Sequence, residues 1–110
     1  KNLMGTIEDR GSIHRNLGQR IADLASLIRP PLTVMDAVRI LMANGPTGGN
    51  LNDVKALDTV IAGTDMVAID AYATRWFDRR PDDVPYIVKE AEMGLGTTDL
   101  SSLTIAELAL

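Results

Sequence analysis

Hydrophobic residues in the first third of the chain recur every three or four positions, at Ile13, Leu17, Ile21, Leu24 and Ile28. This spacing predicts an amphipathic helix over Ile13–Arg29. Ser12 is placed to act as its N-cap. Pro30-Pro31 ends the helix, because proline lacks an N–H group and disfavours helical geometry in the residue before it.

Two short apolar runs predict buried strands. They are Leu32–Met35, which ends at Asp36, and Thr59–Gly63. Residues 37–42 continue the first strand or begin a helical turn, and the pattern leaves both open. Near the end of the chain, Leu103–Ala106 favours a last strand, although residues 105–110 also suit a short helix.

Two further helices are expected after the second strand. Thr64-Asp65 supplies an N-cap for a helix from Met66 to about Phe77. A third helix is expected over about 84–93, with its ends marked by Asp82 or Asp83 as the cap, Pro85 in the first turn and Gly94 after the last turn.

Short apolar strands that alternate with helices predict an α/β fold, with a mainly parallel sheet of three or more short strands covered by about three helices. A length of 110 residues predicts a single domain over 1–110. The chain begins at Lys1 without an initiator methionine, so we expect it to be a fragment of a longer protein.

Composition narrows the classes of function. An apolar share of 45% and a charged share of 24% are typical of a globular domain. The net charge of −4 disfavours nucleic-acid and membrane-surface binding. No apolar run approaches the roughly 20 residues that span a bilayer, and no signal-peptide pattern is present, so a cytoplasmic location is expected. With no cysteine, the segment itself has no disulfide, thiolate nucleophile or cysteine-ligated iron–sulfur cluster.

Two carboxylates are the leading candidates for chemistry. Ligands of parallel α/β sheets favour the crevice beyond the carboxyl ends of the strands, where Asp36 is expected. Asp70 lies at the border of the apolar stripe of its helix, where a carboxylate needs a partner. Asp36 and Asp70 therefore form a candidate catalytic pair and a candidate divalent-metal site, for which magnesium is the easiest ion. The alternatives are a turn or cap role for Asp36 and a structural pairing for Asp70.

His14 is the single histidine, and we consider it as a proton carrier in this crevice or as a packed or surface imidazole. A glycine-rich loop is the other candidate element, although its spacing is that of neither a P-loop nor a dinucleotide-binding loop. An ordinary tight loop is the alternative, and an N-cap is the favoured role of Asp65. The candidate ligand-binding residues are Asn44, Gly45, Thr47, Gly48, Gly49, Thr64 and Asp65.

Several stretches occur in an order that resembles a known family. They are Lys1-Asn2-Leu3 with Gly5, His14, Ala22-Asp23-Leu24, Val34-Met35-Asp36-Ala37, Asn44-Gly45-Pro46-Thr47-Gly48-Gly49, the AGTDMVAIDA stretch from Ala62 to Ala71, and Gly94-Leu95-Gly96. The chain resembles the domain-of-unknown-function family 362 over essentially its whole length, and it matches the C-terminal half of that family. Met66 departs from the family pattern, which usually has proline after the aspartate.

The resemblance implies no established catalytic role. Many members of the family resemble iron–sulfur proteins, because a ferredoxin-like cysteine cluster lies elsewhere in their polypeptide. Because this segment has no cysteine, we expect no cofactor within it. The resemblance implies a 4Fe–4S cluster elsewhere in a longer parent. The first hypothesis is a module of an iron–sulfur-associated redox protein that binds a small anionic or metal-chelated ligand. The second is a non-catalytic scaffold or docking domain for a ferredoxin-like neighbour. No Ser-His-Asp or Cys-His arrangement favours a particular enzyme class.

Overall fold

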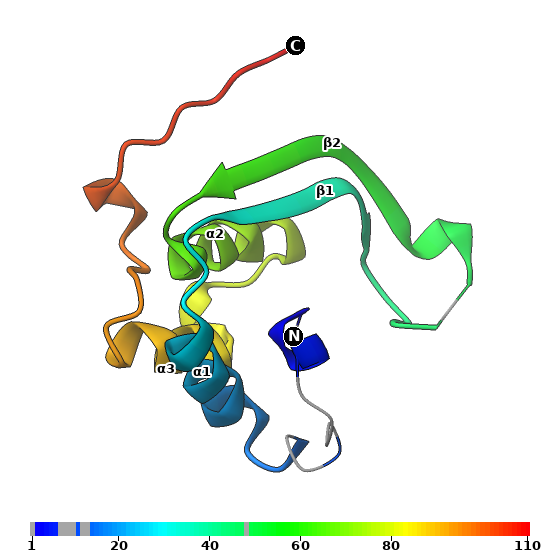
Figure 1. Ribbon diagram of the computed structural model, residues 1–110. Helices are drawn as coiled ribbons and strands as arrows, with labels where there is room; N and C mark the ends of the chain where they lie inside the picture. Colours follow the sequence, from blue (N-terminus) through cyan, green and yellow to red (C-terminus); the bar gives the residue numbers. More distant parts are fainter. Residues whose placement is uncertain (1, 7–10, 12–13, 48) are drawn as a thin grey trace.

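The structure is a computed structural model that describes residues 2–6, 11, 14–47 and 49–110. Within these residues the chain forms α1 (Leu17–Ile28), β1 (Thr33–Leu41), β2 (Val54–Gly63), α2 (Met66–Ala73) and α3 (Pro85–Glu92). Short 3₁₀ turns occur at Asn2–Thr6, Leu51–Asp53, Thr74–Phe77, Pro81–Asp83 and Leu100–Ser102. The two strands form a layer on one side of α2, and α1 and α3 pack together on its other side (Figure 1).

The sheet of the described residues is a two-stranded antiparallel hairpin, so the predicted mainly parallel sheet of three or more strands is wrong. Thr33 pairs with Gly63 at one end, and Leu41 pairs with Val54 at the other. A parallel pair would need a crossover of a dozen or more residues, usually a helix. In the described residues of the connection 42–53, the only helical element is the Leu51–Asp53 turn, and the connection closes a hairpin instead.

β1 continues through Asp36 to Leu41, which resolves the open choice for residues 37–42 in favour of strand. The register shifts between Ala37 and Arg39, opposite Asp58, whose φ of 48° is in the left-handed region. An irregularity of this kind bends a hairpin and increases its local twist. As a result, the half of the hairpin next to α2 covers that helix, and the distal half extends away from it (Figure 1).

The predicted first helix is confirmed in its central and C-terminal parts. α1 ends at Ile28, and Arg29 adopts a φ of 44° as C-cap, directly before Pro30. The helix begins later than predicted, at Leu17, after Asn16 as N-cap. The predicted cap, Ser12, lies outside the described residues.

The second and third helices are also confirmed, with changes at their ends. α2 begins at Met66 after the Asp65 cap, and Thr74–Phe77 continues it as a 3₁₀ turn. α3 begins at Pro85, and Gly94 follows it with a φ of 71°. The predicted cap of α3 is wrong: Asp82 and Asp83 belong to the preceding 3₁₀ turn, whose first N–H donor, Arg80 N, bonds to the Asp83 carboxylate at 2.9 Å.

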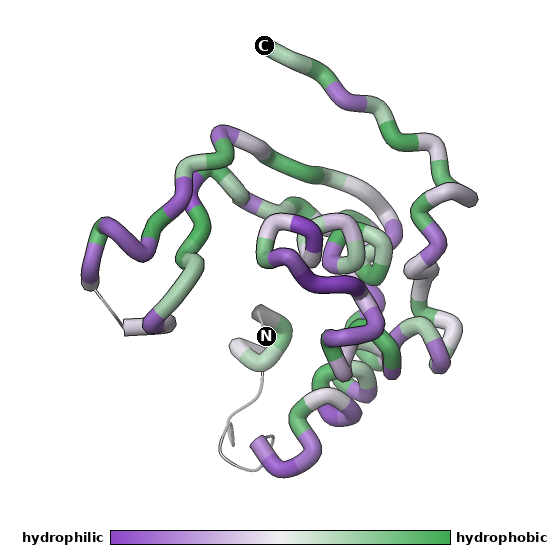
Figure 2. The backbone as a smooth tube through the Cα atoms, turned by 180° about the vertical axis from the view of Figure 1, so that it is seen from behind, coloured by the Kyte–Doolittle hydropathy of each residue, from purple (hydrophilic) through white to green (hydrophobic). Residues whose placement is uncertain are grey.

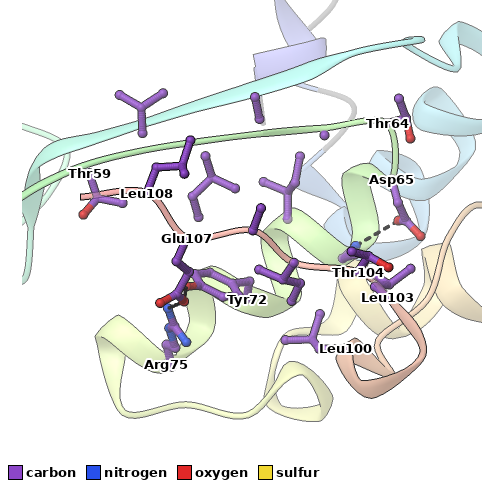
Figure 3. A pocket seen from close by; sticks show the side chains of 18 of the residues that line it. Thr59, Thr64, Asp65, Tyr72, Arg75, Leu100, Leu103, Thr104, Glu107 and Leu108 are labelled. Atoms are coloured by element: carbon purple, nitrogen blue, oxygen red, sulfur yellow. Dashed lines mark hydrogen bonds and ion pairs between the residues drawn. The ribbon is translucent and has the colours of Figure 1, made fainter. Parts of the chain in front are cut away.

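Residues 103–110 form neither the favoured strand nor the alternative helix. They run as an extended, exposed segment beside β2, from the end near Asp65 towards Thr59 (Figures 1 and 3). No backbone hydrogen bond joins this segment to β2 among the described residues.

The main cluster of the core lies where α2 meets α3 and contains Val67, Ala71 and Ile87, each at most 3% exposed. Ala22 and Ala25 of α1 are also fully buried. Gly18 allows α1 to approach α3 closely, because a Cβ at this position would lie 2.9 Å from the Cβ of Pro85. The described residues contain no helix that is both long enough and apolar enough to cross a membrane.

Candidate functional site

Asp36 lies within β1 rather than at its end, between the inward-facing Met35 and Ala37. Because side chains alternate along a strand, the Asp36 carboxylate is on the opposite, outer face of the hairpin. Its strand partner Val60 is 60% exposed there. The carboxylate accepts the N–H of Val38 at 2.9 Å, which is the turn-type role that the sequence left as its alternative.

Asp70 lies on the other side of β1, on the face of α2 that meets α3. It lines a cavity of ≈ 310 Å³ together with Tyr86 of α3. Asp36 also borders this cavity, but its side chain belongs to the outer face of the hairpin. The two carboxylates therefore do not converge on one ion or one substrate.

The surroundings of Asp70 are acidic and poorly solvated. Burial raises the pKa of Asp70 above its ordinary value, and a hydrogen bond with Tyr86 offsets part of that effect. Burial, together with the charge of Asp70, raises the pKa of Glu90 to about 7. The pKa of Tyr86 rises for the same two reasons, so its phenol stays protonated and able to donate to a carboxylate. The cluster of Asp70, Tyr86 and Glu90 can hold a proton or attract a cation.

The glycine-rich loop lies at the tip of the hairpin, far from α2 (Figure 1). Its conformation is held by local bonds. Asn44 donates to the Asp53 carboxylate at 3.0 Å, and Asn50 accepts the N–H of Asn52 at 3.0 Å. Gly45, Thr47 and Gly49 are exposed in this loop, and Gly48 lies outside the described residues. The loop does not meet Asp70 in a common crevice.

The remaining predicted residues lie in two further places. His14 is exposed and borders neither of the two cavities described here. Thr64 and Asp65 line a groove of ≈ 550 Å³ between the last part of β2, α2 and the segment 103–108. The structure thus distributes the predicted site residues over the outer hairpin face, the hairpin tip, the α2–α3 cavity and this groove.

Asp65 uses both carboxylate oxygens. Oδ1 accepts the N–H of Ala68 at 2.9 Å, which confirms the predicted N-cap of α2. Oδ2 accepts the N–H of Thr97 at 3.0 Å, across 32 positions of sequence. Gly96 makes this approach possible, because a Cβ there would overlap Asp65 Oδ1 and lie 2.8 Å from the Cβ of Val67. Asp65 therefore fixes the start of α2 and the path of the C-terminal segment.

The groove contains a polar contact between α2 and the C-terminal segment (Figure 3). The hydroxyl of Tyr72 donates to Glu107 Oε1 at 2.6 Å, and Arg75 lies 3.8 Å from the same oxygen. The guanidinium of Arg75 also lies over the Tyr72 ring, 3.4 Å from its centroid. Trp76 packs edge-on against that ring, with the centroids 6.2 Å apart. One carboxylate is thereby held by a phenol and a guanidinium on a single turn of helix.

No group of three or more histidine, aspartate or glutamate side chains in the described part of the chain is arranged to hold a metal ion. An iron–sulfur cluster also does not fit these residues, because the chain contains no cysteine to ligate it. Any such cluster would need ligands from outside this sequence.

Sequence reasoning missed Tyr86 and Glu90, although a signal was present. On α3, Glu90 follows Ile87 by three positions and Tyr86 by four, so the three residues share one helical face. An acidic residue within an apolar stripe marks a buried carboxyl. Tyr72, Arg75 and Glu107 had no such local signal, since 35 positions separate Tyr72 from Glu107.

The fold defines a small α/β domain in which one helix lies between a hairpin and a helix pair. Residues 1–75 match the family model described as "Domain of unknown function (DUF362)", and the chain belongs to this family. It is also 25% identical over 107 residues to the thylakoid-associated protein sll1697 of Synechocystis sp.. That match covers 89% of this chain and 32% of the relative, so the chain spans about a third of the relative's length. No solved structure matches the chain significantly.

Proposed function

We propose that this chain is a docking domain whose exposed hairpin face packs against a ferredoxin-like neighbouring domain. The observation that carries this proposal is the outer face of the hairpin. We define the outer face by the side chains of Val34, Asp36, Val38, Val60 and Ala62, which point away from α2. Val34 and Val60 are each 60% exposed, and Val38 is 41% exposed.

Burial of this face against a partner would be favourable. A two-stranded hairpin is stable only when another element covers it, and here α2 covers one face alone. Complete burial of a valine side chain stabilises a complex by roughly 1.5–3 kcal/mol. Exposed apolar side chains gathered on one face are typical of a protein interaction surface. The Asp36 carboxylate lies among them, opposite Val60, and is the polar group of this face.

The comparisons leave room for a partner of this kind in the same polypeptide. The relative is about three times as long as the matched region, so a homologous polypeptide has room for further domains. Its name describes it as thylakoid-associated. The ferredoxin-like domain that the family resemblance implies is the partner we propose.

Single-cysteine labelling tests this function, because the chain has no cysteine of its own. Val60→Cys would be introduced into the gene in its natural host, with Leu27→Cys on α1 as a matched apolar control that is 81% exposed. The variants are labelled with a maleimide in cell extract and as the purified chain, and the modified peptide is quantified by mass spectrometry. We expect Val60→Cys to react more slowly in extract than when purified, and Leu27→Cys to react equally in both. Equal rates for Val60→Cys in the two samples would refute docking through this face.

A second candidate function rests on the cavity at Asp70. Asp70 and Tyr86 supply oxygen atoms to the lining of this cavity, so the candidate ligand is a divalent cation or a metal-chelated molecule. Titration with Mg²⁺, Mn²⁺ or Zn²⁺ should then move the backbone NMR signals of residues 70, 86 and 90 in the wild-type chain, and not in Asp70→Asn. Signals that stay in place in the wild-type chain would eliminate this candidate.

A further inference from the structure

The free edge of β2 and the side of α2 that carries Tyr72 form a groove (Figure 3). β1 occupies one edge of β2, and no strand pairs with the other edge among the described residues. The backbone groups of an unpaired edge are available to another extended segment. The groove, at ≈ 550 Å³, is long enough to contact six successive residues, Leu103 to Leu108.

We propose that this groove binds an extended, acidic peptide segment antiparallel to β2, and that Tyr72 and Arg75 recognise its carboxylate. The chain's own residues 103–108 form one side of the groove, where Glu107 contacts Tyr72 and Arg75, and they show how such a segment lies. They run from beside Asp65 to beside Thr59, opposite to the direction of β2 (Figures 1 and 3). An antiparallel strand added to a sheet edge in this way obtains affinity from main-chain bonds and specificity from side-chain contacts.

The specificity comes from the contact with Glu107. Its carboxylate accepts from the Tyr72 hydroxyl at 2.6 Å and lies 3.8 Å from Arg75. Arg75 stacks on the face of the Tyr72 ring, and Trp76 packs edge-on against the same ring, which restricts the positions of the two groups that contact the carboxylate. The last part of the chain is mostly hydrophobic (Figure 2). In the sequence of residues 103–108, Glu107 is the charged position.

Residues 103–108 are held weakly enough for another peptide segment to replace them. All of residues 103–110 are exposed, and Leu108 is 86% exposed. The side chains of Arg75 and Glu107 are 54% and 73% exposed, and exposed ion pairs of this kind contribute only about 0–1 kcal/mol. A competing segment with better main-chain pairing can therefore replace residues 103–108. Val60 and Ala62 of the outer face also border the groove. The inference rests on the free edge of β2, Tyr72 and Arg75 rather than on the outward-pointing side chains, so it does not depend on the proposed docking function.

The test uses the full chain with Glu107→Ala, which removes the resident carboxylate from Tyr72 and Arg75 and leaves the groove residues of β2 and α2 unchanged. An N-acetylated peptide with the sequence of residues 103–110, LTIAELAL, is titrated into the isotope-labelled variant. We expect saturable shifts of the backbone amides of residues 59–63 and of Tyr72. The same peptide with alanine in place of its glutamate should bind about five- to tenfold more weakly, as expected for loss of a charge-assisted hydrogen bond.

Two further variants localise the effect. Tyr72→Phe, combined with Glu107→Ala, keeps the aromatic packing but removes the hydroxyl, and should weaken binding of the glutamate peptide by a similar factor. Val34→Thr, on the outer face of β1 and outside the groove lining, should leave the affinity unchanged. Should the peptide leave residues 59–63 unshifted, or should the glutamate and alanine peptides bind equally well, the proposal is overturned.

Discussion

The double role of Asp65 leads to a quantitative prediction about stability. In Asp65→Ala, α2 loses its N-cap, and the segment that contains Thr97 loses the acceptor for its N–H. Loss of an N-cap costs about 1 kcal/mol, and loss of a hydrogen bond to a carboxylate costs about 1–2 kcal/mol at a half-buried site. We therefore expect the free energy of unfolding to fall by about 2–3 kcal/mol.

Asp65→Asn separates the two contributions. Asparagine caps a helix about as well as aspartate, but it has a single acceptor oxygen, so only one of the two bonds survives. The expected loss is about 1–2 kcal/mol, intermediate between wild type and Asp65→Ala. Urea unfolding followed by the fluorescence of Trp76, the single tryptophan, measures all three proteins.

Gly96→Ala gives an independent check through a double-mutant cycle. An added Cβ would collide with Asp65 Oδ1, so the substitution should be less destabilising when Asp65 is already alanine. The reasoning would be refuted if Asp65→Asn were as stable as wild type and the Gly96→Ala cost were the same in both backgrounds. In that case the bond to Thr97 contributes nothing.

Three other predictions concern the core, the buried acid and the outer face. Ile87→Ala should lower the free energy of unfolding by about 2–4 kcal/mol, because the side chain is 1% exposed; a loss under about 1 kcal/mol in urea unfolding would contradict the assigned core. The pKa of Glu90 is about 7 when folded and 4.5 in the reference state, so its carboxyl binds protons more tightly in the folded chain. The contribution of Glu90 to stability is complete below about pH 4.5 and is lost as the pH rises through about 7. The loss is on the order of 2–3 kcal/mol. Glu90→Gln should flatten this decline in thermal unfolding measured from pH 5 to 8. Unchanged pH dependence in Glu90→Gln would show that another group titrates. Val34→Thr combined with Val60→Thr should change the unfolding free energy of the purified chain by less than about 0.5 kcal/mol, since both side chains face solvent; a larger loss in urea unfolding would mean that they pack within the chain.

The helices could be predicted because their ends carry strong local signals. Pro30 after α1, Asp65 before α2 and Gly94 after α3 each act through backbone geometry or hydrogen bonds within a few residues. Such signals do not depend on the rest of the fold. The predicted cap of α3 was wrong because Asp83 can accept a hydrogen bond either from α3 or from the preceding turn. In the structure it accepts the N–H of Arg80 in the preceding turn.

The sheet could not be predicted from the apolar runs alone. Runs such as residues 32–35 and 59–63 fit a buried parallel strand, but hydrophobicity carries no information on strand direction. The informative feature was the connection, because residues 42–53 are rich in glycine and asparagine and show no helical period. A connection of this kind favours a hairpin over a parallel crossover.

The error in strand direction explains why the predicted crevice did not form. In a parallel sheet, the residues that follow neighbouring strands meet at the same edge. In the hairpin, the loop after β1 and the residues after β2 lie at opposite ends, which separates Gly45 from Asp65. The individual local roles were predictable, as the cap at Asp65 shows, but their assembly depended on topology.

Site-specific photo-crosslinking from the outer face tests the docking function most directly. A benzophenone amino acid at position 60, in the protein expressed in its natural host, is irradiated in intact cells, and cross-linked peptides are identified by mass spectrometry. The account predicts cross-links from position 60 to a cysteine-rich, ferredoxin-like domain, and none to that domain from position 27 on α1. If position 60 forms no cross-link to such a domain, while control cross-links elsewhere show that the reaction works, the docking function is contradicted.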